Sequence, residues 1–195
     1  MCRIAQLWLV AVLADGCAAG DVDPIDHDGS VDPGPANRWV AAEAPADLVG
    51  EGWAIGDTVP ETILLDQYGD PVELWQFWDR VVILSFSAMW CVPCREVAGA
   101  AQQIAEENPG DVVDVTVLLE DASGLPVSPD EAAEWADELG VASPVLADPE
   151  RSTAPALAGR FPTVLVLDRA LTVSSSCDVP TYDALVPLVE SEFQP

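Results

Sequence analysis

The spacing of apolar positions from about residue 53 onward changes repeatedly between the patterns of strands and helices. Residues 81–86 and 112–119 are continuous apolar runs rich in β-branched side chains, as in strands buried on both faces. Five shorter strands are predicted at residues 62–65, 72–74, 145–146, 163–167 and 172–175. The first two of these flank a turn at residues 67–70 and therefore predict a β-hairpin.

Three segments have helical character. Residues 95–107 carry apolar side chains on one side, and Asn108-Pro109-Gly110 ends the run. Residues 129–139 are amphipathic, with Ser128 as the expected N-cap and Gly140 as the expected C-cap. A last helix is predicted at residues 182–193. Alternating strands and helices predict an α/β fold, a mixed central β-sheet flanked by helices with an N-terminal β-hairpin extension.

The first 47 residues have a different composition and are predicted to lie outside this domain. Residues 1–17 are typical of an export signal, with an apolar run at 4–14 about half as long as the ~20 residues that cross a bilayer. Ala14-Asp15-Gly16-Cys17 resembles a bacterial lipobox, in which Cys17 would be lipidated and become the mature N-terminus. Cleavage that leaves Cys17 unmodified remains the alternative. Residues 18–47 predict a disordered acidic tether rich in proline and glycine, and residues 48–195 the folded domain.

Charge narrows the possible functions. The 195 residues contain 34 Asp and Glu against 7 Lys and Arg, a formal net charge of -27. Such a field repels phosphate backbones and anionic lipids, so we expect no nucleic-acid binding and membrane contact only through a lipid anchor. The single histidine, His27, lies among acids in the tether, where we expect it to be solvated. We therefore predict no metal site and no histidine-based catalysis.

The candidate chemistry lies in Trp90-Cys91-Val92-Pro93-Cys94, where a buried strand ends and a helix begins. Free N–H groups and the helix dipole stabilise a thiolate there. We expect Cys91 to be the nucleophile, with an exposed sulfur, and Cys94 to be the shielded resolving thiol. Pro93 suits the first helical turn, because its missing N–H has no partner to lose.

Other uses of a CxxC motif fit less well. A haem attachment site would have histidine at the position of Arg95, and a zinc site would need two further ligands. A Sco-type copper chaperone would need a CxxxC motif and a later histidine. A purely structural disulfide remains possible in an exported protein.

From about Gly56 to its end the chain resembles the thioredoxin superfamily, most closely the exported TlpA/ResA-like and redoxin (AhpC/TSA-related) branch. The resemblance is carried by Gly56-Asp57-Thr58-Val59-Pro60 with Leu64 and Gly69, Phe86 to Arg95, Gly159-Arg160-Phe161-Pro162-Thr163 and Leu167-Asp168. It implies that Pro162 is cis and lies against the Cys91–Cys94 disulfide. Trp90, Pro93, Phe161, Pro162 and Thr163 would then support the site and bind substrate.

Three positions depart from the family pattern. Ser85 stands where classical thioredoxins carry a buried aspartate. Val97 replaces a glutamate found in many TlpA/ResA-like members, and Glu96, one position earlier, is expected to face solvent. Ala88 replaces the threonine of peroxiredoxins, which weakens a peroxidase assignment. Cys177 is interpreted as a half-buried small residue, with a third reactive thiol as the alternative.

The resemblance implies an exported thiol–disulfide oxidoreductase on the periplasmic side of a bacterial membrane, with reduction favoured over oxidation. Its partners would be thiols and disulfides of exported proteins and a membrane or periplasmic electron donor. It would need no cofactor besides the redox-active Cys91–Cys94 disulfide. The alternatives are a non-catalytic thioredoxin-fold adaptor with a structural disulfide and, less favoured, a thiol peroxidase.

Overall fold

The computed structural model describes residues 37–153, 160–178 and 180–193. The predicted export signal, Cys17 and most of the predicted tether therefore lie outside the described residues, as does Gly159 of the sequence motif. The described strands form one seven-stranded sheet in the order β2-β1-β5-β4-β3-β6-β7. Their bounds are β1 (Ile63–Asp66), β2 (Pro71–Glu73), β3 (Val81–Ala88), β4 (Val112–Glu120), β5 (Val145–Ala147), β6 (Thr163–Leu167) and β7 (Val173–Asp178).

The sheet is mixed, as the sequence predicts. Strands β3, β4 and β5 run parallel to one another, whereas β6 pairs antiparallel with β3 and β7 antiparallel with β6. The predicted hairpin of β1 and β2 is present and joins the same sheet, because β1 also pairs antiparallel with β5. Every residue of β3 is buried, which explains its unbroken apolar pattern.

In the described ranges three helices accompany the sheet: α1 (Val92–Glu107), α2 (Pro129–Leu139) and α3 (Tyr182–Ser191). A short 3-10 helix, η1 (Leu74–Phe77), precedes β3. Helix α2 has the predicted bounds and caps: the Ser128 hydroxyl accepts from the Glu131 N–H, and Gly140 ends the helix with a φ of 67°. Helix α1 begins three residues earlier than the apolar pattern indicates, because Cys91 is its N-cap.

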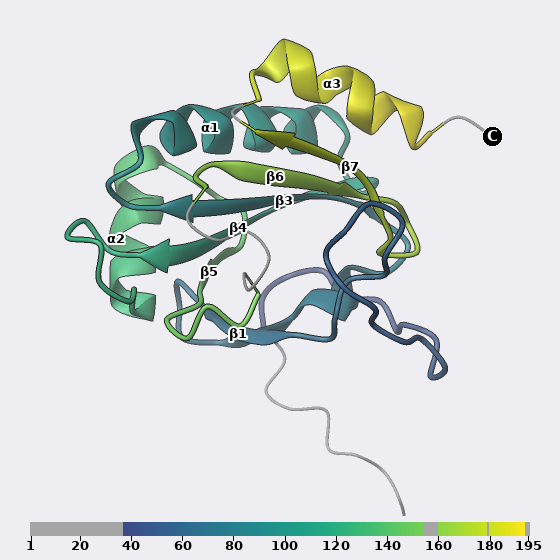
Figure 1. Cartoon of the computed structure of the whole chain (residues 1–195), viewed down its shortest axis with the longest axis horizontal. Helices are drawn as coiled ribbons and strands as arrows, with labels where there is room; N and C mark the ends of the chain where they lie inside the picture. The colour runs from purple at the N-terminus through teal and green to yellow at the C-terminus, as the bar shows by residue number, and fades with distance from the viewer. Residues whose placement is uncertain (1–36, 154–159, 179, 194–195) are drawn as a thin grey trace, which may run out of the picture. The chain divides into compact units, whose positions relative to one another are not determined.

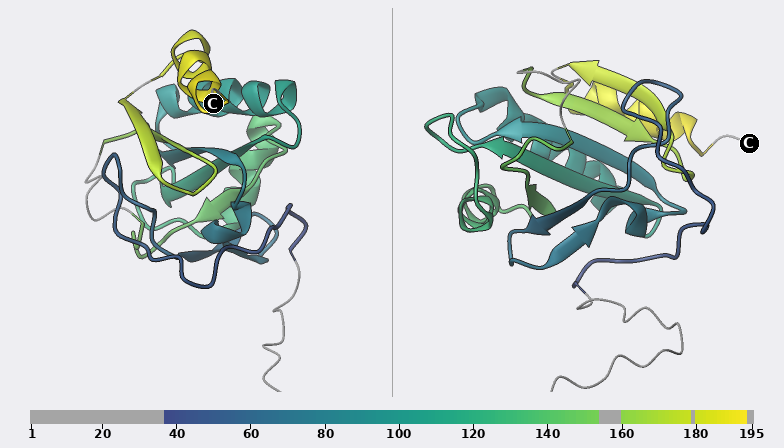
Figure 2. Two further views of the ribbon diagram at one scale, coloured as in Figure 1. Left: turned by 90° about the vertical axis from the view of Figure 1, so that its right-hand side faces the viewer. Right: turned by 60° about the horizontal axis from the view of Figure 1, so that its bottom comes forward.

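The two faces of the sheet are covered differently (Figures 1 and 2). Side chains of β3 and β6 pack with α1 and α3 on one face, and Leu118 of β4 packs with α2. On the other face the core of Leu84, Phe86 and Val117 is covered by tryptophans from the N-terminal part of the domain, at positions 39, 53, 75 and 78. Tryptophan side chains bury a large apolar area, so a few of them suffice to cover the core on this face without a helix.

Residues 37–47 differ from the prediction, which placed them in the tether. The Trp39 indole donates to Asp66 at 2.6 Å, and the Asn37 amide donates to the Pro71 carbonyl oxygen at 2.8 Å. The Ala42 N–H donates to the Gln76 carbonyl oxygen at 2.8 Å. The folded part therefore extends to at least Asn37. The composition of residues 37–47 does not indicate this packing, because one tryptophan and one asparagine make most of these contacts.

Among the helices of the described residues, none is both long enough and apolar enough to cross a membrane.

Candidate redox site

Cys91 and Cys94 form a disulfide at the carboxyl end of β3, with their Cα atoms 5.3 Å apart. The cysteines follow β3 directly and so lie at the edge of the sheet where that strand ends. The Cys91 N–H donates to the Ala88 carbonyl oxygen at 3.0 Å, which closes the turn between strand and helix. Both cysteines pack with Ala88 and Phe161. The sequence motif thus lies at the predicted junction of strand and helix.

The sulfur of Cys91 caps helix α1. It accepts the backbone N–H of Cys94 at 3.2 Å, and Pro93 lies in the first turn, as predicted. A thiolate at this position would gain the same N–H and the positive end of the helix dipole. The local backbone therefore favours the charged form of Cys91 once the disulfide is reduced.

The expected difference in exposure between the two sulfurs is wrong for this oxidised form. Cys91 is 2% exposed and Cys94 0%. The spacing of the motif predicts an exposed first sulfur, but Phe161 packs against the disulfide here. A partner thiolate would reach the Cys91 sulfur of this disulfide only if neighbouring side chains move.

Aromatic side chains flank the disulfide. Trp90 is 49% exposed, and its ring meets the ring of Phe161 edge to face at a centroid distance of 5.9 Å. The Phe161–Pro162 peptide bond is cis, as the resemblance implied. Thr163 begins β6 and pairs with Phe86 of β3, and its hydroxyl donates to the Arg160 carbonyl oxygen at 3.0 Å. Two strands therefore bring together the residues that the sequence placed at one site.

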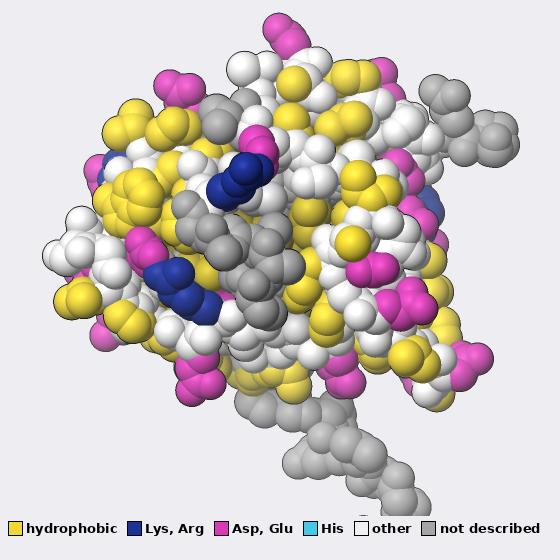
Figure 3. Space-filling view, in the orientation of Figure 1, with side chains coloured by type: hydrophobic (Ala, Val, Ile, Leu, Met, Phe, Trp, Pro, Cys, Tyr) yellow, Lys and Arg dark blue, Asp and Glu magenta, His cyan; other side chains and the backbone are white. Residues whose placement is uncertain are grey.

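Glu120 and Arg151 join this group, although sequence reasoning gave them no role. The Trp90 indole N–H donates to the Glu120 carboxylate at 2.7 Å, and Arg151 forms an ion pair with the same carboxylate. Near the middle of the face in Figure 3, arginine side chains form two small groups with acidic side chains beside them. The sequence does hold a signal for Glu120. Strand β4 runs parallel to β3, so an acidic residue at the end of β4 lies at the same edge of the sheet as the cysteines.

The structure shows the surroundings of four more residues that the sequence analysis discussed. Ser85 is 1% exposed, and its hydroxyl has no hydrogen-bond partner among the described residues. Glu96 is exposed, as predicted. Arg95 forms an ion pair with Glu138 of α2 at 2.6 Å, which lowers the pKa of Glu138. Cys177 lies on β7 with intermediate exposure, in agreement with its interpretation as a half-buried residue.

One buried acid lies away from the disulfide. Burial raises the pKa of Asp114 to about 7, partly offset by the hydrogen bond that Ser143 donates to it at 2.8 Å. Asp114 pairs with Ile83, near the opposite end of β3 from Cys91. It therefore does not contact the cysteines.

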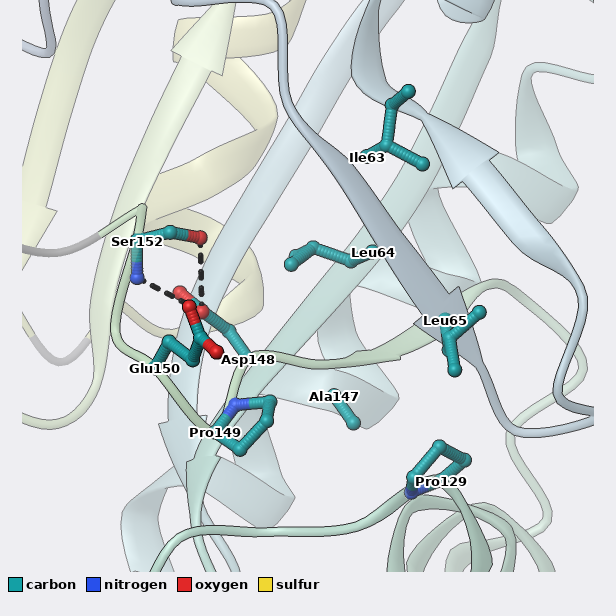
Figure 4. A pocket seen from close by; sticks show the side chains of 9 residues that line it. All are labelled: Ile63, Leu64, Leu65, Pro129, Ala147, Asp148, Pro149, Glu150 and Ser152. Atoms are coloured by element: carbon teal, nitrogen blue, oxygen red, sulfur yellow. Dashed lines mark hydrogen bonds between the residues drawn. The ribbon is translucent and has the colours of Figure 1, made fainter.

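A groove of about 240 Å³ lies between β1 and the chain after β5 (Figure 4). Its lining is mostly apolar, including Ile63 and Leu65, and Ser152 donates to Asp148 at one end. No cysteine lines this groove. In the part of the chain that the structure describes, no cluster of three or more His, Cys, Asp or Glu could hold a metal ion.

The fold and the CxxC disulfide define a thioredoxin-like protein. The family model for AhpC/TSA matches residues 55–176, and the chain belongs to this family.

Individual proteins are more distant. The thioredoxin-like protein YneN of Bacillus subtilis is 26% identical over 145 residues, 67% of this chain and 84% of that protein. A solved structure from Chlorobium tepidum, named as a thiol:disulfide interchange protein DsbE, is 24% identical with a TM-score of 0.61, over 72% of this chain and 99% of that one. The exposed lipoprotein thioredoxin Etrx1 of Streptococcus pneumoniae is 22% identical with a TM-score of 0.57, over 67% and 98%.

Proposed function

We propose that this protein is a thiol–disulfide oxidoreductase that exchanges electrons with other proteins through Cys91 and Cys94. The observation that carries the proposal is the Cys91 sulfur at the N-cap of α1, accepting the Cys94 N–H at 3.2 Å. A structural disulfide needs no such placement, whereas a nucleophilic thiolate is stabilised by it.

In the reductive direction the exchange has two steps. The Cys91 thiolate attacks one sulfur of a partner disulfide, which forms a mixed disulfide and releases one partner thiolate. The Cys94 thiolate then attacks the Cys91 sulfur, which restores the Cys91–Cys94 disulfide and releases the second partner thiolate. Two electrons pass to the partner, and each released thiolate takes a proton from water. A separate donor must return two electrons to Cys91–Cys94.

The neighbouring side chains suit the binding of a partner chain. Trp90 provides exposed apolar surface, and Phe161, Pro162 and Thr163 lead from the disulfide into β6. We propose that these residues bind the segment around the partner's cysteine, with Pro93 shaping the turn between the two thiols. The names of similar proteins, an interchange protein and a thioredoxin, support this class of partner.

The reduction potential tests the proposal. We would use the full chain with Cys2, Cys17 and Cys177 replaced by serine, equilibrate it with glutathione and follow tryptophan fluorescence. A reversible two-electron titration with a midpoint below about −230 mV is expected and supports a reductase. A midpoint above about −150 mV would assign a disulfide-forming oxidant instead. A pair that does not titrate reversibly would contradict the proposal and leave the adaptor with a structural disulfide.

We also propose that the protein acts outside the cytoplasm and is anchored by a lipid on Cys17. Support comes from the apolar run at 4–14, the lipobox-like residues before Cys17, and a similar structure that is named an exposed lipoprotein. Labelling with radioactive palmitate in a bacterial host tests the anchor. Label that persists in the Cys17→Ala variant would contradict it.

A further inference from the structure

Glu120 occupies an irregular position at the end of β4. Ser87 of β3 pairs with Leu118, but the next residue, Ala88, pairs with Glu120, so that Leu119 is an extra residue in β4. Such a bulge turns the following side chain in a new direction, and bulges are frequent beside active sites. Here it places Glu120 opposite the residue that lies three positions before Cys91.

The Glu120 side chain holds Trp90. The indole N–H donates to the carboxylate at 2.7 Å, and the carboxylate side chain is only 14% exposed. Hydrogen bonds to a charged acceptor are stronger than neutral ones, and partial burial protects this bond from water. Phe161 contacts the same indole edge to face at 5.9 Å. The indole beside Cys91 is therefore fixed from two sides.

Arg151 reaches Glu120 from a constrained loop. Its φ is 54°, a left-handed conformation that is uncommon for a residue other than glycine. The loop is held by Asp148: its carbonyl oxygen accepts the Arg151 N–H at 3.2 Å, and its buried carboxylate accepts from Ser152 and Thr153. Strain of this kind persists only where surrounding contacts maintain it, and here it accompanies the ion pair to Glu120.

We propose that Glu120 is a positioning residue for thiol–disulfide exchange and that Arg151 balances its charge. This inference rests on the exchange reaction proposed above. Glu120 fixes the indole of Trp90, whose ring contacts Phe161, and Phe161 packs against the disulfide. A carboxylate that is hydrogen-bonded to the residue before Cys91 would oppose formation of the Cys91 thiolate, since like charges disfavour each other. The Arg151 guanidinium offsets this effect. Glu120 can therefore hold the Trp90 indole without making the Cys91 thiolate less stable.

Variants that remove one charge at a time test whether Arg151 offsets the effect of Glu120 on Cys91. In the full chain with Cys91 as the only cysteine, we would measure the rate of alkylation by iodoacetamide between pH 4 and 10. Arg151→Gln leaves the carboxylate unbalanced and should slow alkylation at neutral pH by about threefold, moving the profile to higher pH. Glu120→Gln should move the profile the opposite way. The double variant should return to within about twofold of the parent.

Asp111 and Arg169 provide the matched control. They form an ion pair at 2.5 Å between the residue just before β4 and the turn after β6, at the opposite end of β4 from Glu120. Asp111→Asn and Arg169→Gln alter net charge by the same amounts and should leave the alkylation profile unchanged. Equal shifts in these variants would show a general effect of net charge and overturn the proposal.

The indole provides a second readout. Glu120→Leu removes the acceptor, whereas Glu120→Gln retains an amide oxygen; the Trp90 contribution is assigned by subtraction of a Trp90→Phe variant. We expect Glu120→Leu to lower the fluorescence anisotropy of Trp90 and Glu120→Gln to preserve it. Unchanged anisotropy in Glu120→Leu, or alkylation shifts of one sign in both single variants, would overturn the proposal. A parent protein that titrates reversibly while these variants show no effect would contradict only the positioning role, not the proposed exchange.

Discussion

Asp114 is a buried acid whose ionisation should make stability depend on pH. It is 1% exposed, and burial raises its pKa from 3.8 to about 7, with the Ser143 hydroxyl acting in the opposite direction. A raised pKa means that the folded state holds the proton more tightly than the unfolded state. The stabilising contribution of this proton is therefore complete below about pH 3.8 and is lost as pH rises to about 7.

Replacing Asp114 with asparagine should remove this dependence. Between pH 5 and 8 we expect the parent to lose about 2–3 kcal/mol of unfolding free energy relative to Asp114→Asn. One carboxylate oxygen of Asp114 has no hydrogen-bond partner among the described residues, so an NH₂ group in its place would have no acceptor there. The slope with pH is therefore the readout rather than absolute stability. Urea denaturation at several pH values measures it. Parallel pH profiles for the two proteins would contradict the prediction.

Single residues differed in how far the sequence could predict them. The positions of Cys91, Cys94 and Trp90 and the cis bond before Pro162 follow from a local motif and its resemblance, and the structure places these residues together. Glu120 and Arg151 could not be predicted in the same way. Their contact depends on a bulge and on a left-handed residue, both of which arise from tertiary packing rather than local pattern.

Among the elements, both ends of α2 could be predicted to the residue, because capping residues in the sequence mark where the helix begins and ends. Ser128 and Glu131 form a capping box, and Gly140 provides the left-handed C-cap. Helix α1 has a weaker signal at its start: Pro93 marks the first turn, but the N-cap is a cysteine. The segment around Trp39 was missed for another reason: without regular periodicity, its packing depends on a few long-range contacts.

Two glycines allow opposite predictions from the same substitution. Gly140 has a φ of 67°, and Gly99 lies exposed inside α1; an added Cβ would meet nothing within 4 Å at either position. Gly140→Ala should therefore destabilise by about 1 kcal/mol through backbone strain alone. Gly99→Ala should stabilise by about 0.5–1 kcal/mol, because alanine favours the helix. Thermal and urea unfolding measure both, and effects of the same sign would contradict this account.

At the scale of the whole molecule, negative charge surrounds the candidate redox site, and the arginines near this site are already paired. The formal net charge is -27, and Figure 3 shows acidic side chains spread over the visible face. Arg95, Arg151 and Arg160 lie near the disulfide in sequence or space, and each forms an ion pair with a carboxylate. The local cations therefore do not reverse the field that an approaching partner meets.

This field should select between small disulfides of opposite charge. The reduced protein should react with cystamine, which is cationic, roughly tenfold faster than with anionic dithiodipropionate at low ionic strength. At 0.5 M salt the two rates should converge, because exposed charges are screened beyond a few ångströms. Stopped-flow fluorescence of the full chain with only Cys91 and Cys94 retained measures both rates. If the anionic disulfide reacted faster, the paired arginines would have to dominate the local field, and an acidic partner segment would then fit the site better than a basic one.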